Sequence, residues 1–459
     1  MRKLLVANRG EIAVRIIQAA RELGIRTVAV CSEADVGAVH VRLADEHVVI
    51  GPAAASRSYL DIDAVIKAAT DRGADAVHPG YGFLAERAEF AERVIQAGMA
   101  FVGPAPEAIR LMGDKTAARA SAARVGVPTV PGSDGPVRDQ AAAFAAAQRA
   151  GYPVVVKAAA GGGGRGIRVV ASAAELGDAL PVAQAEAAAA FGNGDLYVER
   201  FVPAARHVEV QVFGDGERVV HLGERECSMQ RRRQKVIEEA PAPGLPPRVR
   251  EAMTSAAVRL AASVGYRGAG TAEFLYDPAR EEFFFIEMNT RIQVEHPVTE
   301  MVTGRDLVRE QLCVAAGAPL SFTQEEVEIR GHAMEFRINA EDPAQGFLPS
   351  PGTLAMLRMP GGPFVRVDTG YQAGSQVSPF YDSLLAKIIV WGDTREWALA
   401  RARRALGELE VHGVATTAGF LRSIIELPEF RQGQYHTTFL EDWMAEQAAR
   451  GDELVRRTQ

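Results

Sequence analysis

Two carboxylates stand on consecutive predicted strands, Thr271–Tyr276 and Phe283–Met288. If this hairpin turns around Arg280, antiparallel pairing places Glu273 directly opposite Glu287. Two facing carboxylates repel each other and are costly on a half-buried sheet. A divalent cation between them removes that cost, and Mg²⁺ commonly takes one or two carboxylates together with substrate phosphates. The hairpin therefore predicts a cation site that accompanies a phosphate compound.

The alternation continues past the second strand, where every odd position from Glu287 to Glu295 is polar and most even positions are apolar. If the chain stays extended, five polar side chains line one face: Glu287, Asn289, Arg291, Gln293 and Glu295. A solvated sheet edge is the alternative interpretation. Read as an active site, Glu287 and Asn289 would hold metal, Arg291 would bind an anion, and Glu295 would act as general base.

A glycine run at Gly161–Gly164, followed by Arg165 and Gly166, formally satisfies G-x-G-x-x-G. A dinucleotide fingerprint would lead into a helix, but Ile167–Val170 reads as a strand, and no G-x-x-x-x-G-K-[ST] sequence is present. A glycine loop between two strands is typical of a hairpin that closes over a triphosphate with its backbone N–H groups. Lys157 ends the preceding apolar strand, where its ammonium could reach phosphate oxygens. An ordinary Gly-rich turn remains the alternative.

Two weaker signals lie upstream of the hairpin. His207, Glu209 and Gln211 share one face of a predicted strand, although a lone histidine there is more often structural than a ligand. The run Arg231–Arg233 precedes Lys235 and resembles a nucleic-acid patch only superficially, because the chain as a whole is acidic. A site for a small anion is the better interpretation.

The N-terminal hundred residues must form a parallel sheet, because short apolar runs alternate with amphipathic helical patterns. The predicted strands are Leu4–Ala7, Arg26–Val30, His47–Ile50, Ala76–His78 and Phe101–Val102. The predicted helices between them are Glu11–Leu23, Tyr59–Arg72 and Glu86–Ala97. This part of the chain is predicted to be Rossmann-like.

A Pro- and Gly-rich linker, Val125–Gly135, leads into a small Ala-rich module that would act as a lid. From His207 onward the pattern becomes antiparallel, with a hairpin around Asp215-Gly216 between Val208–Phe213 and Val219–Gly223. The predicted fold class is α/β and α+β. We expect three domains: residues 1–113, Rossmann-like; 114–203, linker and lid; and 204–459, α+β with an antiparallel sheet.

Composition excludes several classes of protein. The 459 residues carry 58 acidic and 51 basic side chains, a net charge of −7, which argues against nucleic-acid binding. Uncharged stretches such as Gln311–Gln324 are too short to span a bilayer, and the first residues do not resemble a signal peptide. Three widely spaced cysteines, Cys31, Cys227 and Cys313, fit free thiols in a reducing compartment. We therefore expect a cytoplasmic protein without membrane association.

Taken together, these motifs resemble biotin carboxylase, the ATP-grasp component of biotin-dependent carboxylases. The resemblance covers essentially the whole chain, in segments that include Ala7–Ile16, His78–Glu86, Leu111–Lys115, Arg206–Val212, Cys227–Gly244, Gly331–Pro343 and Tyr381–Ile388. The sequence EMNTRIQVEHPVTE, which ends at Glu300, is the most specific of its motifs. The resemblance implies ATP-dependent carboxylation of biotin with bicarbonate through carboxyphosphate.

The resemblance also implies a role for each matching residue. The ATP phosphates would be bound by Lys115, Lys157 and the loop residues Gly162, Gly163, Gly164 and Gly166. The nucleotide base would lie against Glu199, Arg200, Val202 and Leu275, with His207 and Gln230 also in contact. Two Mg²⁺ or Mn²⁺ ions would be held by Glu273, Glu287 and Asn289. Bicarbonate would be bound by Lys235, Arg291, Gln293 and the backbone of Val294, deprotonated by Glu295, and the biotin enolate stabilised by Arg337.

Two positions depart from the family pattern. Arg233 stands where His or Asn is common, which puts a ribose contact in doubt, and Arg200 stands where Lys is frequent. A different ATP-grasp ligase, or a catalytically silent nucleotide-binding subunit, are the alternatives to the family assignment.

Partners are expected by the same resemblance. No lysine follows Lys387, so biotin would be carried by a separate carrier protein, and carboxyltransferase subunits would use the carboxylated product. We expect a homodimer, with acetyl-CoA as the default final acceptor. Only six of the basic residues are lysines, and three of them, Lys115, Lys157 and Lys235, fall at the phosphate and bicarbonate positions. Lys387 has no predicted role.

Overall fold

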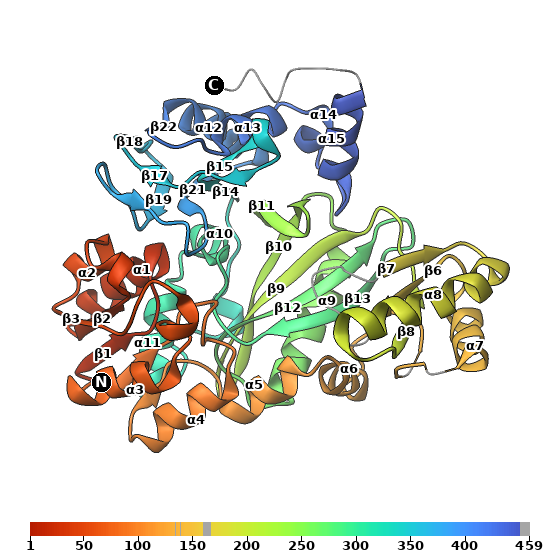
Figure 1. Ribbon diagram of the computed structural model, residues 1–459, viewed down its shortest axis with the longest axis horizontal. Helices are drawn as coiled ribbons and strands as arrows, with labels where there is room; N and C mark the ends of the chain where they lie inside the picture. Colours follow the sequence, from red (N-terminus) through yellow and green to blue (C-terminus); the bar gives the residue numbers. More distant parts are fainter. Residues whose placement is uncertain (134, 138, 159–166, 450–459) are drawn as a thin grey trace.

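The computed structural model describes residues 1–133, 135–137, 139–158 and 167–449. Figure 1 shows an N-terminal α/β part, a small module on the opposite side, and a long antiparallel sheet that runs between them toward the C-terminal helices. This arrangement confirms the predicted fold class. The predicted division at residues 113 and 203 remains a prediction. Among the described residues, no helix is both long and apolar enough to cross a membrane.

The N-terminal sheet is parallel, with strand order β3-β2-β1-β4-β5, as predicted. Its strands are β1 (Lys3–Val6), β2 (Arg26–Cys31), β3 (Glu46–Val49), β4 (Ala76–His78) and β5 (Ala100–Phe101). The accompanying helices are α1 (Gly10–Glu22), α2 (Val39–Leu43), α3 (Ile62–Asp71), α4 (Ala88–Gln96) and α5 (Pro106–Gly113). Helix α3 begins three residues later than predicted, because the Asp61 carboxylate accepts the Ala64 N–H at 3.0 Å and caps the helix there.

The small module carries an antiparallel sheet of order β7-β6-β8. Its elements are α7 (Gln140–Ala150), β6 (Val154–Ala158), β7 (Ile167–Val170), α8 (Ala173–Phe191) and β8 (Leu196–Arg200). Helix α6 (Lys115–Arg124) precedes the module. Alanines on α7 and α8 pack against Val154, Val156 and Val198, which gives the module a core of its own.

The large sheet has eight antiparallel strands in the order β13-β12-β9-β10-β11-β14-β21-β19. Their bounds are β9 (Arg206–Asp215), β10 (Val219–Arg231), β11 (Gln234–Ala240), β12 (Arg267–Asp277), β13 (Glu282–Asn289), β14 (His332–Asn339), β19 (Val365–Thr369) and β21 (Leu384–Gly392). The predicted hairpin around Asp215-Gly216 is confirmed, with Phe213 paired to Val220. The predicted pairing of Glu273 with Glu287 is also confirmed, although a β-bulge shifts the register on the turn side, where Phe274 pairs with Phe285.

Helices pack against the sheet faces that carry apolar side chains, which alternate with polar side chains along each strand. Val208, Val210 and Val212 of β9 pack against α9 (Pro247–Ala262), so the odd-numbered polar residues of the same strand face the other way. The C-terminal half is packed by α12 (Arg395–Glu408), α13 (Ala418–Ile424), α14 (Pro428–Gln432) and α15 (Phe439–Ala449). The remaining helices are α10 (His296–Thr303) and α11 (Leu307–Ala315). Short strand pairs β15–β16 (Glu341–Asp342, Leu348–Pro349), β17–β20 (Gly352–Thr353, Gln376–Val377) and β18–β22 (Met356–Arg358, Glu410–His412) complete the C-terminal part.

Candidate functional site

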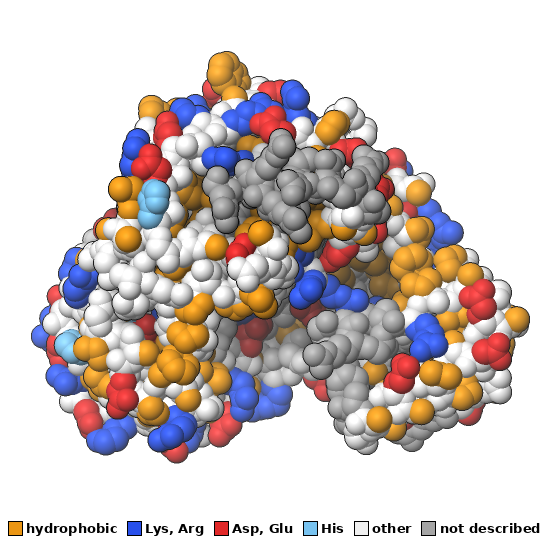
Figure 2. All heavy atoms as spheres, turned by 45° about the horizontal axis from the view of Figure 1, so that its top comes forward, with side chains coloured by type: hydrophobic (Ala, Val, Ile, Leu, Met, Phe, Trp, Pro, Cys, Tyr) orange, Lys and Arg blue, Asp and Glu red, His pale blue; other side chains and the backbone are white. Residues whose placement is uncertain are grey.

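A cleft of about 1410 Å³ lies where the N-terminal part, the small module and the large sheet meet. Figure 2 shows the hollow on this face, with acidic and basic side chains gathered inside it. Most of the predicted site residues line it: Lys157, Arg200, Val202, His207, Gln230, Lys235, Glu273, Leu275, Glu287, Asn289, Arg291, Gln293, Val294, Glu295 and Arg337. Arg233, the departure from the family pattern, also lines it. The structure thus brings together residues that are nearly 200 positions apart in the chain.

The two facing carboxylates differ in their electrostatic surroundings. Burial would raise the pKa of Glu273, but Lys235 and His207 outweigh it and hold that pKa well below its ordinary value. Burial and the neighbouring Glu273 charge raise the pKa of Glu287. Asn289 Nδ2 donates to Glu273 Oε1 at 2.8 Å, which places the amide beside both carboxylates. A pair of acidic groups with one pKa raised by like charge fits a divalent cation, which would relieve the repulsion.

Lys235 is the cation at the centre of the acidic residues. Its Nζ lies 2.5 Å from Glu295 Oε1, 2.6 Å from Glu209 Oε2 and 3.2 Å from Glu273 Oε1. Burial lowers the pKa of Lys235, but Cys227 and the surrounding carboxylates raise it well above the ordinary value. The ammonium is therefore charged.

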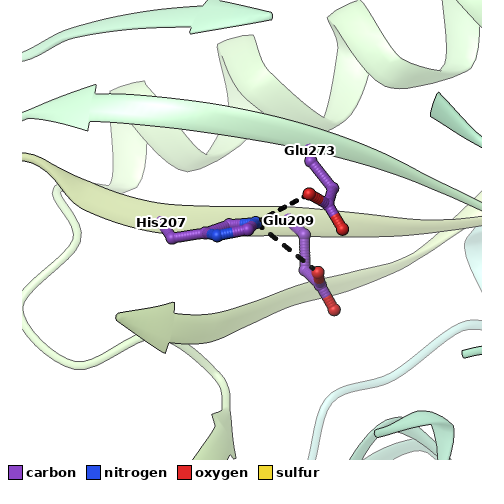
Figure 3. A group of neighbouring side chains, drawn as sticks. All are labelled: His207, Glu209 and Glu273. Atoms are coloured by element: carbon purple, nitrogen blue, oxygen red, sulfur yellow. Dashed lines mark ion pairs between the residues drawn. The ribbon is translucent and has the colours of Figure 1, made fainter. Parts of the chain in front are cut away.

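His207 lies on β9 and lines the cleft beside Glu273. Its Nε2 is 3.1 Å from Glu273 Oε2 and 3.9 Å from Glu209 Oε2, as Figure 3 shows. Its Nδ1 lies 2.9 Å from Gln230 Nε2, and the contact of both residues with a nucleotide remains a prediction. The side chains of His207, Glu209 and Glu273 could in principle ligate a metal. The Lys235 ammonium lies 2.6 Å from Glu209 and 3.2 Å from Glu273, so it would compete with a cation for both carboxylates.

Glu295 is almost fully buried, with 2% of its surface exposed, at the start of α10. Its second oxygen, Oε2, accepts from Arg337 Nη2 at 3.0 Å. Burial would raise the pKa of Glu295, but Lys235, Arg337 and Arg225 hold it well below its ordinary value. The carboxylate is ionised at neutral pH and lies between two cations.

The expectation of an extended chain up to Glu295 is wrong. Strand β13 ends at Asn289, and Glu295 is the N-cap of α10 with φ −82° and ψ 7°. Pro297, in the first turn, favours the helix start because its missing N–H would have no partner there. The five polar side chains nevertheless line the same cleft, because the irregular segment after β13 turns them toward it.

Several partners of the site residues could not be predicted from the sequence. Arg225 of β10 is fully buried and donates to Glu209 at 2.6 Å and to Gln293 Oε1 at 2.9 Å. Glu86 accepts from Arg291 Nε at 2.9 Å, and Glu238 accepts from Arg337 Nε at 2.6 Å. The only signal for Arg225 is its place in a strand paired with β9, where Arg225 pairs with Glu209.

The small module forms one side of the cleft. Lys157 Nζ of β6 lies 2.6 Å from Glu199 Oε2 of β8, and Arg119 of α6 also binds Glu199. Lys115 is the first residue of α6 and, like Glu199, is not among the residues that line the cleft. The predicted loop residues Gly162, Gly163, Gly164 and Gly166 lie outside the described residues.

Three family models match consecutive parts of the chain. "Biotin carboxylase, N-terminal domain" matches residues 1–109, and "Biotin carboxylase C-terminal domain" matches residues 335–442. Residues 114–323 match "Carbamoyl-phosphate synthase L chain, ATP binding domain". The biotin carboxylase of Pseudomonas aeruginosa is 54% identical over 443 residues, covering 96% of this chain and 98% of that one. The chain belongs to the biotin carboxylase family. It is an ATP-dependent ligase of the ATP-grasp type.

Other biotin carboxylases share both the sequence and the fold. Biotin carboxylase 1 of Bacillus subtilis is 52% identical over 444 residues, covering 96% of this chain and 99% of that one. The Campylobacter jejuni biotin carboxylase in complex with β,γ-ATP is 45% identical with a TM-score of 0.90, covering 96% of this chain and 98% of that one. The biotin carboxylase domain dimer of Hydrogenobacter thermophilus 2-oxoglutarate carboxylase is 47% identical with a TM-score of 0.89, covering 99% and 98%. That dimer holds MgADP, ADP and bicarbonate.

Proposed function

We propose that this biotin carboxylase uses ATP and bicarbonate to carboxylate biotin on a separate carrier protein, as a component of an acetyl-CoA carboxylase. One observation carries the proposal: the buried Glu295 carboxylate lies between Lys235 and Arg337 in a cleft that also contains the facing carboxylates Glu273 and Glu287. Activation of bicarbonate requires a base that takes its proton and cations that bind the anion. Binding of a metal–triphosphate requires carboxylates that hold the metal ion beside the phosphates.

The first step is the removal of a proton from bicarbonate. Bicarbonate is a poor nucleophile until it loses that proton, and its charge repels the triphosphate. Lys235 and Arg291 would bind the anion, with Gln293 and the backbone of Val294, while Glu295 accepts the proton. An anion that shares the Lys235 ammonium would weaken the contact between Lys235 and Glu295, and the carboxylate would become a stronger base when it is needed.

Phosphoryl transfer follows on the other side of the cleft. Lys115, Lys157 and the glycine loop at residues 161–166 would bind the ATP phosphates. Two Mg²⁺ or Mn²⁺ ions would be held by Glu273, Glu287 and Asn289. When bound, these ions would neutralise the negative charge on the transferred phosphoryl group. Glu199, Arg200, Val202, His207, Gln230 and Leu275 would surround the nucleoside. The Hydrogenobacter domain dimer with MgADP and bicarbonate supports this assignment.

Carboxyphosphate then yields CO₂ and phosphate. The released phosphate would take the ureido proton of biotin, and the resulting enolate would attack CO₂. Arg337, which faces the cleft from β14 and is held by Glu238, would stabilise the enolate oxygen. Water must be excluded, because it would hydrolyse the intermediate, and closure of the small module would exclude it.

The experiment that tests this function is phosphate release from ATP, measured with and without bicarbonate and with and without free biotin. We expect bicarbonate-dependent hydrolysis that biotin stimulates. Hydrolysis by metal-loaded protein that neither compound changes would contradict the proposal and would favour another ATP-grasp ligase.

The proposal extends to partners. We infer a biotinylated carrier, carboxyltransferase subunits, a homodimer and a cytoplasmic location, supported by the bacterial relatives and by the dimer of the Hydrogenobacter domain. Related structures include the biotin carboxylase subunit of pyruvate carboxylase, 48% identical with a TM-score of 0.87, covering 97% of this chain and 98% of that one. A pull-down of the carrier followed by a screen of acetyl-CoA, other acyl-CoA esters and pyruvate identifies the acceptor. Carboxylation of pyruvate alone would overturn the acetyl-CoA assignment.

A further inference from the structure

Lys387 is a fully buried lysine outside the set of residues assigned above. It lies on β21, where it pairs with Arg337 of β14 on one side and Asp368 of β19 on the other. Its side chain is 0% exposed, which is rare for lysine because burying an unpaired ammonium is costly. A lysine kept at such a position needs specific partners.

The partners of Lys387 are one backbone carbonyl and two carboxylates. Its Nζ donates to the Val294 carbonyl at 2.8 Å and lies 3.1 Å from Glu11 Oε1 and 3.7 Å from Asp368 Oδ2. Burial lowers the pKa of Lys387, but Glu11 and the other nearby carboxylates outweigh it and raise that pKa. The group is a charged ammonium that binds three acceptors from three separate parts of the chain.

The Val294 carbonyl belongs to the segment that carries the proposed bicarbonate residues. Residues 290–294 lie between β13 and α10 and form neither helix nor strand, so side chains supply part of their backbone hydrogen bonding. The Gln293 carbonyl accepts from the His296 backbone N–H at 3.3 Å and lies 2.7 Å from His296 Nδ1, both at the start of α10. The Val294 carbonyl accepts instead from Lys387, which is 93 positions away in the chain.

The same ammonium ties this segment to the N-terminal part of the protein. Glu11 of α1 also accepts from the Tyr81 hydroxyl, and both residues line the cleft. The two parts are closely packed here, because a Cβ at Gly370 would lie 2.6 Å from the Gly10 carbonyl carbon. Lys387 therefore fixes the segment against a rigid support rather than against a surface loop.

We propose that Lys387 is a positioning residue for bicarbonate activation: its bond to the Val294 carbonyl sets the place of Gln293, Val294 and Glu295 relative to Lys235. This inference rests on the proposed function of the segment. Lys387 does not touch the reacting atoms itself. A displacement of about 1 Å at a reacting centre can cost on the order of 100-fold in rate, so loss of this bond has a measurable effect.

The test compares Lys387→Met and Lys387→Arg with the wild type. Lys387→Arg keeps the charge, but a planar fork cannot reproduce the three contacts of a compact ammonium. For each folded variant we expect the KM for bicarbonate to rise about 10-fold or more and kcat to fall by a similar factor. The Kd for ATP should stay within about twofold, because none of the three contacts of Lys387 involves a residue proposed to bind the nucleotide.

A matched control is Arg395→Lys. Arg395 binds Glu239 at 2.7 Å and has 13% of its side chain exposed, but it packs on α12, away from the cleft. This swap changes a half-buried cation on a helix that packs against β21, so its loss of thermal stability should come without a change in the KM for bicarbonate. If Lys387→Met does not fold, Lys387→Arg alone decides. A Lys387→Arg enzyme with wild-type kinetics, or with the KM values for ATP and bicarbonate raised alike, would overturn the proposal.

Hydrogen exchange separates this inference from the proposed function. Amides in the peptide spanning 290–296 should exchange faster in Lys387→Arg than in the wild type or in Arg395→Lys, while the β12–β13 hairpin stays unchanged. Unchanged exchange in that peptide overturns the positioning role. A wild type without bicarbonate-dependent ATP hydrolysis would instead overturn the proposed function, and the exchange result would still stand on its own.

Discussion

Replacing Glu295 with Gln removes the proposed base while keeping the size of the side chain. The carboxylate bonds to Lys235 at 2.5 Å and to Arg337 at 3.0 Å, and both cations have a second carboxylate partner, Glu209 and Glu238 respectively. Because those partners remain, neither cation is left unpaired in Glu295→Gln. The variant should therefore fold, and its defect should be chemical.

The magnitude of the defect follows from the role of a general base. A positioned base contributes about 10²- to 10⁴-fold to a rate, which corresponds to about 3–5 kcal/mol of activation free energy. An amide cannot accept the bicarbonate proton, so kcat for bicarbonate-dependent ATP hydrolysis should fall within that range. The Kd for ATP should change by less than about twofold, because Lys157 and Glu199 lie on the small module.

The assay is bicarbonate-dependent phosphate release, together with ATP binding by calorimetry. A suitable control is Glu310→Gln, which changes another buried carboxylate, one that accepts from Ser321 N at 2.7 Å and does not line the cleft. The control should keep the wild-type kcat. If Glu295→Gln turned over at the wild-type rate, Glu295 would not be the base and the reasoning from its position would be refuted.

Two further predictions concern the metal and the acid stability of the fold. Glu287→Gln should raise the Mg²⁺ concentration for half-maximal ATP hydrolysis by about 10-fold or more, and EDTA should abolish hydrolysis in the wild type. The exposed Glu251→Gln is the control, and an unchanged Mg²⁺ requirement in Glu287→Gln would remove Glu287 from the site. For Glu239, burial would raise the pKa, but Arg395 and His332 hold it far below the ordinary 4.5, so its stabilisation is present above pH 4.5 and is lost as the pH falls below it. Urea unfolding should show Glu239→Gln less stable than wild type by about 3–5 kcal/mol at pH 7, with the difference shrinking below pH 4.5, whereas a constant difference would contradict the assignment.

Local patterns were sufficient to predict the elements and one key register. The parallel N-terminal sheet follows from strand and helix periodicity, and the pairing of Glu273 with Glu287 follows from placing one turn at Arg280. Both depend on short stretches of chain, in which side-chain alternation reports which face is buried.

The sequence could not predict contacts between distant segments. Nothing in the local sequence distinguishes Arg225 and Lys387 from other strand residues. Their partners lie on other segments of the chain, which come together only in the folded protein. The start of α10 at Glu295 was missed because alternating polarity continues through the irregular segment, so the pattern alone cannot distinguish it from a strand. Roles carried over by family resemblance agree with the placement of most site residues in the cleft, but the roles themselves remain predictions.

The most direct test of the central claim is the transfer of labelled bicarbonate carbon to biotin. Purified protein is incubated with ATP, Mg²⁺, free biotin and ¹⁴C-bicarbonate, and acid-labile label on biotin is measured. The account predicts labelled biotin that requires ATP, Mg²⁺ and an intact Glu295. ATP hydrolysis at the same rate with and without bicarbonate, with no label on biotin, would contradict it.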